Sequence, residues 1–115
     1  MMSEIEQARH AEQRGTILRV LHEDYTAPMT SVGTLARILD SMGVSLSVES
    51  LEFHLVYLAQ QGFIDIWRAG EMPKFRTDRR AIPFVSPQTI VFAKLSGKGA
   101  QLIDGNIAGD PKVAF

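Results

Sequence analysis

The chain has 115 residues, of which 45% are hydrophobic and 22% charged, and this is the composition of one soluble globular domain. It contains no cysteine, which excludes disulfides and thiolate chemistry, and no apolar run approaches the ~20 residues of a membrane span. The N-terminus is charged throughout and does not have the pattern of a signal peptide, so we expect a cytoplasmic protein.

The first helix is predicted over residues 4–24. Its strongest apolar periodicity follows Gly15, which interrupts the pattern. The polar part before this glycine is either a frayed extension or a dimerisation arm. A second helix is predicted over residues 31–42, with Thr30 or Ser31 as its cap and Gly43 at its end.

A third helix is predicted to begin at a cap formed by Ser47 or Ser50 and to end at Gly62. Its leucines recur at spacings of four and three residues, which places them on one face. We expect Leu55 and Leu58 to be buried against four leucines of the first two helices: Leu18, Leu21, Leu35 and Leu39.

The second half of the chain predicts a hairpin. A strand over residues 63–68 is followed by a long, proline-rich connection over residues 69–88 and a returning strand over residues 89–95. Ser96 caps a short last helix that ends near Gly105. The expected fold class is therefore α+β, with one domain over residues 1–105 and an irregular tail over residues 106–115.

Two segments carry a resemblance to known proteins. The segment H-L-V-Y-L-A-Q-Q-G-F-I (54–64) and the segment L-S-G-K-G-A-Q-L-I (95–103) resemble signatures of winged helix-turn-helix domains. This resemblance implies a three-helix core, a two-stranded β wing and a short C-terminal helix. Over residues 14–113, the segments T-I-L-R-V-L, L-A-Q-Q-G-F-I, L-S-G-K-G and D-P-K-V also resemble a small family of winged-helix proteins of Mu-like phages and prophages. The resemblance implies a phage context and no assigned activity.

Charge is unevenly distributed along the chain, although its net value is only −1. Residues 1–67 carry nine acidic and four basic side chains, whereas residues 68–98 carry seven basic and two acidic ones. The predicted third helix has no lysine or arginine and carries Glu49 and Glu52. A basic wing beside an acidic body indicates a binding surface, with a merely solvated loop as the alternative.

Two functions follow as hypotheses. The first is a prophage regulator that binds double-stranded DNA mainly through its wing. Its expected contacts are the wing cations Lys74, Arg76, Arg79, Arg80 and Lys94, helped by Ser50 and Tyr57 of the third helix. The second is a homodimeric protein-interaction module without DNA binding, for which a phage or host protein is a further candidate partner. Its expected interface residues are Ile5, Ala8, Phe53, Val56, Leu102 and Ile103, and the alternative for Phe53 is packing under the wing loop.

Nothing in the sequence favours an enzyme. Its histidines, at positions 10, 22 and 54, lack partners at metal-ligand spacing. Gly97 and Gly99 flank Lys98 without the strand, loop and helix of a phosphate-binding motif. We therefore expect no catalytic residue, no bound metal and no cofactor.

Overall fold

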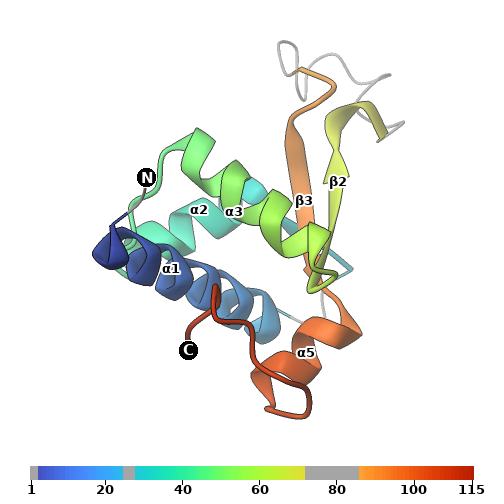
Figure 1. The fold of residues 1–115 in the computed structure, drawn as a ribbon. Coiled ribbons are helices and arrows are strands. Elements are labelled where there is room, and N and C mark those ends of the chain that lie inside the picture. Colours follow the sequence, from blue (N-terminus) through green and yellow to red (C-terminus); the bar gives the residue numbers. More distant parts are fainter. Residues whose placement is uncertain (1–2, 25–27, 72–85) are drawn as a thin grey trace.

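The computed structural model describes residues 3–24, 28–71 and 86–115, which form an α+β structure. In chain order its elements are α1 (Glu4–Glu23), β1 (Thr30–Ser31), α2 (Val32–Ser41), α3 (Val48–Gln60), β2 (Ile64–Arg68), the 3₁₀ turn η1 (Ala69–Glu71), β3 (Ile90–Leu95) and α5 (Gly97–Ile103). Figure 1 labels the longer elements.

Serine side chains start the helices. The hydroxyls of Ser31, Ser47 and Ser96 each accept a hydrogen bond from the backbone N–H three residues later, so of the candidate caps Ser31 and Ser47 are the ones used. Glycine ends α3, because Gly62 has a φ of 80°, a conformation that a Cβ would disfavour. The predicted positions of the helices are thus confirmed to within a residue or two.

The sheet has three strands: the two strands of the expected hairpin are present as β2 and β3, and β1 is a third strand that the sequence pattern did not predict. The strand order is β1-β3-β2, and both pairings are antiparallel. β1 pairs Thr30 with Ala93 and Ser31 with Phe92. A two-residue strand has no periodicity to detect, and Ser31 also caps α2, so the sequence pattern indicated only a helix start.

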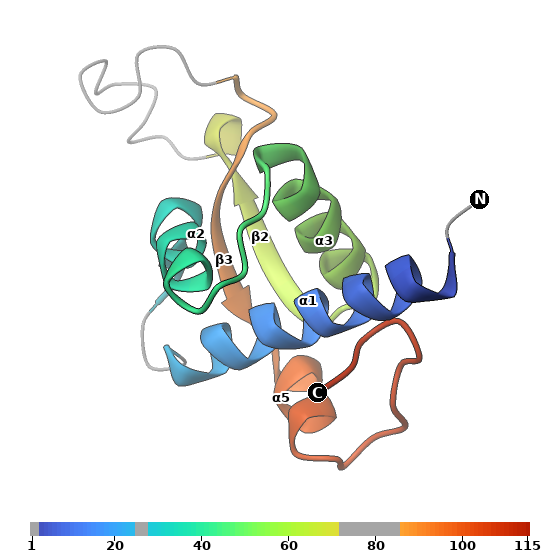
Figure 2. The same ribbon diagram turned by 90° about the vertical axis from the view of Figure 1, so that its left-hand side faces the viewer.

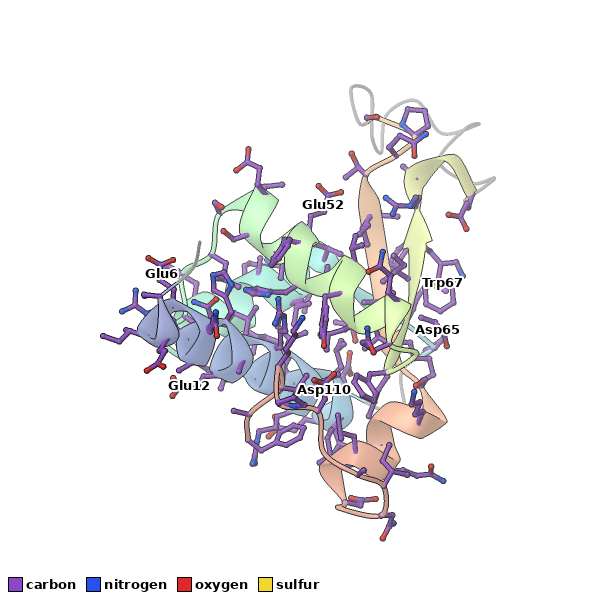
Figure 3. The ribbon with its side chains drawn as sticks, in the orientation of Figure 1. Glu6, Glu12, Glu52, Asp65, Trp67 and Asp110 are labelled. Carbon is purple, nitrogen blue, oxygen red and sulfur yellow. The ribbon has the colours of Figure 1, made fainter. Side chains whose placement is uncertain are left out.

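The helices α1, α2 and α3 cover one face of this sheet (Figures 1 and 2). Side chains alternate across β2, so that Ile64 is buried whereas Asp65 is exposed, and Figure 3 shows Asp65 and Trp67 on the side away from the helices. None of the helices in the described part of the chain has the length and apolar run that crossing a bilayer requires.

The core lies between the helices and the inner face of the sheet. The expected contacts of Leu55 and Leu58 are confirmed, since both are fully buried in one cluster with the leucines of α1 and α2. The cluster comprises Ile17, Leu18, Val20, Leu21, Leu35, Leu39, Leu51, Leu55, Leu58, Phe63, Ile64, Ile90, Ala93, Leu95, Leu102 and Val113.

The C-terminal segment, residues 106–115, contains no helix or strand, yet it packs against the body of the protein. Figures 1 and 2 show it returning alongside α1. Val113 is buried in the core, and the backbone N–H of Ala114 donates to the carbonyl oxygen of Ala11 at 2.9 Å. This contact places the segment next to the first half of α1.

Replacing Leu55 by Ala should lower the free energy of unfolding by about 2–5 kcal/mol, because it leaves a cavity where the side chain is fully buried. Urea unfolding followed by circular dichroism measures the loss. Val48→Ala is the control, since Val48 lies on the same helix and is 75% exposed. A loss below about 1 kcal/mol for Leu55→Ala would contradict the packing of α3 described here.

Candidate functional site

The predicted nucleic-acid contacts fall into two groups. Lys74, Arg76, Arg79 and Arg80 lie outside the described residues. Lys94 lies on β3 and is paired in register with Asp65 of β2, so an acidic residue stands directly across from it. At the other end of β2, Arg68 donates from Nη1 to the carbonyl oxygen of Gln88 at 2.6 Å. The strands of the hairpin thus position two cations, one near each end of β2.

The outward side of α3 is acidic. Ser50 is exposed in the first turn of the helix, and its backbone N–H donates to the Ser47 hydroxyl. Figure 3 shows Glu52 on the side of α3 toward which the hairpin extends. Val56 is only partly exposed, because it packs against the core. Tyr57 does not stand free on this side, since its hydroxyl is bonded to the C-terminal segment.

The expected interface residues do not all form one surface, although Ala8 and Phe53 line the same cleft. Ile5 is 72% exposed and Phe53 is 51% exposed, and Ala8 is also exposed. Leu102 was expected beside them, but this is wrong: its side chain is 5% exposed and belongs to the core. Ile103 is partly buried against the same core. The short α5 packs its apolar side against the core, because this side would otherwise be exposed to water.

A cleft of about 590 Å³ separates the first half of α1, the middle of α3 and the C-terminal segment. We refer to it as the α1–α3 cleft. One wall is a stripe of α1 residues spaced three and four apart, and the other walls come from α3 and the C-terminal segment. Its lining residues are Glu4, Gln7, Ala8, His10, Ala11 and Arg14 of α1, Phe53 and Tyr57 of α3, and Pro111 and Lys112.

Arg14 is the charged centre of this cleft. It is 5% exposed, and the guanidinium carbon lies 4.2 Å from the ring centroid of Tyr57 and 5.4 Å from that of Phe53. Its Nη1 donates to the carbonyl oxygen of Lys112 at 3.2 Å. Burial lowers the pKa of Arg14, and the negative charge of Asp110 is among the influences that oppose this shift. A cation between two aromatic rings is stabilised by about 0.5–2 kcal/mol, depending on its desolvation.

Tyr57 joins α3 to the C-terminal segment. Its hydroxyl donates to Asp110 Oδ2 at 2.8 Å, and Asp110 Oδ1 accepts the backbone N–H of Lys112 at 2.8 Å. Burial and the hydrogen bond to Asp110 raise the pKa of Tyr57 to about 12. The hydroxyl therefore remains a donor at any physiological pH, and this donor fixes the segment that forms one wall of the cleft.

Two histidines stand beside Arg14. The rings of His10 and His54 lie edge to face, with centroids 5.1 Å apart. His54 is 1% exposed, and its Nε2 lies 2.9 Å from Gln13 Oε1. Burial and the positive charge of Arg14 lower the pKa of His54 to about 4, so this imidazole is neutral at pH 7. A neutral ring adds no further charge next to the buried guanidinium.

Gly15 allows the C-terminal segment to approach α1. A Cβ at this position would overlap the carbonyl oxygen of Ala114. The sequence pattern presented Gly15 only as an interruption of the helix. A glycine inside a helix costs stability, and such a glycine often marks a close approach of another backbone. Gly15 was therefore a signal in the sequence for this contact. No sequence pattern predicted that Arg14, His10 and Lys112 lie close together.

Among residues 3–24, 28–71 and 86–115, no group of three His, Asp or Glu side chains has the geometry to hold a metal ion. No known protein family, curated protein or solved structure matches the chain. The candidate site is therefore defined by its own geometry: a cleft with a buried arginine, two aromatic rings and a wall formed by the C-terminal segment.

Replacing Gly15 by Ala should lower the free energy of unfolding by about 1–3 kcal/mol, because the added methyl group displaces Ala114 and the neighbouring Val113. Helix propensity alone would raise it by about 1 kcal/mol. Gly33→Ala is the matched control, since a Cβ at Gly33 in α2 meets no atom within 4 Å. Urea unfolding gives both values, and tryptic cleavage after Lys112 should accelerate only in the Gly15 variant. Stabilisation by Gly15→Ala would contradict the observed docking.

The depressed pKa of His54 predicts a loss of stability in acid. The unfolded chain protonates this ring near its ordinary pKa of 6.5, whereas the folded chain protonates it near 4. The free energy of unfolding is therefore highest above pH 6.5. It decreases as the pH falls toward 4, by up to about 3 kcal/mol, because the unfolded chain gains the proton first. Urea unfolding at several pH values between these limits measures it. His54→Gln should show a smaller decline over the same range, and equal declines would contradict the prediction.

Proposed function

We propose that the chain is a winged-helix protein that binds double-stranded DNA through its β2–β3 hairpin. The arrangement of its elements supports this reading. Helices α2 and α3 follow one another across a short turn, and α3 leads directly into an antiparallel hairpin that packs against the helices. The winged-helix resemblance of the sequence involves the same two places, the end of α3 and the start of α5.

The separation of charge is the observation that carries the proposal. The segment from Arg68 to Lys98, which runs from the last residue of β2 through β3 into α5, has seven basic and two acidic residues, whereas residues 1–67 have nine acidic and four basic ones. A phosphate backbone is attracted by the first segment and repelled by the second. The hairpin would therefore approach the duplex while the helical body stays away from it.

The composition of α3 supports the hairpin as the contacting element. Between Val48 and Gln60 the helix has no lysine or arginine and carries Glu49 and Glu52. A helix in the major groove normally needs basic neighbours to hold the phosphates on either side. In this proposal Ser50 is at most a contact at the rim, and Tyr57 supports the protein's own fold. Transcriptional regulation is the process that we propose for such binding, and the resemblance to proteins of Mu-like prophages adds only a phage context.

Fluorescence anisotropy with a random-sequence duplex tests the proposal at about 50 and 200 mM salt, where phosphate contacts differ strongly in strength. The variant Lys94→Ala, and the double variant in which Arg79 and Arg80 are both replaced by Ala, should bind DNA of every sequence more weakly. Each lost phosphate contact should reduce the slope of log affinity against log salt by about 0.9. Arg9→Ala removes an exposed cation from α1 and should change neither quantity.

Two other results would contradict DNA binding through the hairpin. Loss of sequence preference in Ser50→Ala or Glu52→Gln, with unchanged binding in the hairpin variants, would show that α3 reads the bases. Absence of binding even at low salt would favour the second candidate, a homodimeric interaction module. The exposed apolar residues Ile5 and Phe53 favour that candidate, and a dimer mass from light scattering would support it.

A further inference from the structure

We infer that the α1–α3 cleft is a binding site for a small organic anion, namely a carboxylate carried on an aromatic or similarly flat apolar body. This site is separate from the proposed DNA-binding hairpin, and the inference does not depend on DNA binding. It is based on the hydrogen bonding of Arg14, on two neighbouring histidines and on the lining of the cleft.

Arg14 has more hydrogen-bonding capacity than its surroundings use. A guanidinium has five N–H donors. Within the described part of the chain Arg14 uses one of them, from Nη1 to the carbonyl oxygen of Lys112, and its buried Nε has no partner. Because nine-tenths of this side chain is buried while it lines a cleft, a charged group faces the cleft with donors to spare. A carboxylate is the ligand that matches this planar set of donors best.

The other unpartnered buried atoms occur at the same place. In the described residues, the buried side-chain nitrogens and oxygens without a hydrogen bond are Arg14 Nε, His10 Nδ1 and His54 Nδ1. The two imidazoles touch edge to face, and Phe53 lies within 6.0 Å of His10 and 5.4 Å of the Arg14 guanidinium. Buried polar atoms are normally satisfied, so three unpartnered ones in one cluster point to a polar ligand at this place.

The remaining lining residues specify the other half of the ligand. Ala8, Ala11 and Phe53 present apolar surface to the cleft, and a volume of about 590 Å³ lies in the range of small-molecule sites. Lys112 adds a second cation, whereas Glu4 on the α1 wall adds an anion. This balance favours a single negative charge and disfavours a polyanion such as a nucleotide phosphate chain, which would meet Glu4.

Titration of the ¹⁵N-labelled protein with phenylacetate tests the inference, because this probe carries one carboxylate on one flat apolar ring. The resonances of Arg14 Nε–H and of the backbone at Phe53 and Lys112 should move together and saturate, with a Kd of about 1 mM. Phenylacetamide has the same shape without the charge, and acetate has the charge without the ring. Each should bind at least about tenfold more weakly than phenylacetate, because each lacks either the charge or the ring.

Matched variants assign the charge to this site. Lys112→Gln should weaken phenylacetate binding several-fold, whereas Lys98→Gln, which removes a cation in α5, should leave it unchanged. Arg14→Lys keeps the charge, loses the planar set of donors and should abolish the saturable shifts. Because Arg14 also holds the C-terminal segment, the spectrum of this variant first shows whether the fold persists. Where it does not, Lys112→Gln and the amide probe decide.

Three outcomes would overturn the inference. Equal binding of phenylacetate and phenylacetamide would show that charge is not recognised. Absence of saturable shifts up to about 10 mM, a concentration that would fill most of a millimolar site, would show that the cleft takes no such ligand. Concentration-dependent shifts at these residues without any probe, together with a dimer mass from light scattering, would show that an acidic side chain of a second copy occupies the cleft.

Discussion

The inward-facing leucines of α3 determine how the rest of the protein is arranged. Leu51, Leu55 and Leu58 are all at most 4% exposed, so the rotation of α3 about its axis is set by core packing. Phe53 and Tyr57 are four residues apart and form an adjoining stripe, which this rotation turns toward the first half of α1. The aromatic wall of the cleft is thus a consequence of where the leucines must be.

A buried arginine is costly unless its surroundings compensate for the lost hydration. Around Arg14 this compensation comes from the Tyr57 and Phe53 rings, the Lys112 carbonyl oxygen and the nearby charge of Asp110. Most of these contacts come from elements that the chain brings together only on folding. Arg14 therefore connects α1, α3 and the C-terminal segment, and it does so with donors left over for a ligand.

The two proposed sites lie on different parts of the molecule and rely on different physical effects. Binding of DNA by the hairpin would depend on long-range attraction between clustered cations and phosphates, which salt screens strongly. Binding of a ligand in the cleft would depend on short contacts in a partly dehydrated space, where salt has less influence. Their elements meet at α3, whose inner face packs with β2 and whose stripe of Phe53 and Tyr57 lines the cleft. A ligand in the cleft would thus contact the helix next to the hairpin.

Local patterns in the sequence were sufficient for most of the fold, because serine caps, glycine stops and leucine periodicity act within a few residues. They predicted α2 and α3 closely and the burial of Leu55 and Leu58. They missed β1, whose pairing with β3 bridges some sixty residues of chain. They also placed Leu102 at an interface, although its apolar character fits a core equally well.

The cleft was decided by tertiary structure alone. Arg14, Tyr57 and Lys112 are ordinary residues in their local sequence, and no spacing rule joins them. They meet because the C-terminal segment folds back over Gly15, where only a glycine leaves room for the carbonyl oxygen of Ala114. The sequence by itself determined the helices, the hairpin and the separation of charge, since these depend on neighbours along the chain. Only the tertiary structure decided which charged side chain is buried, because burial depends on residues that are distant in sequence.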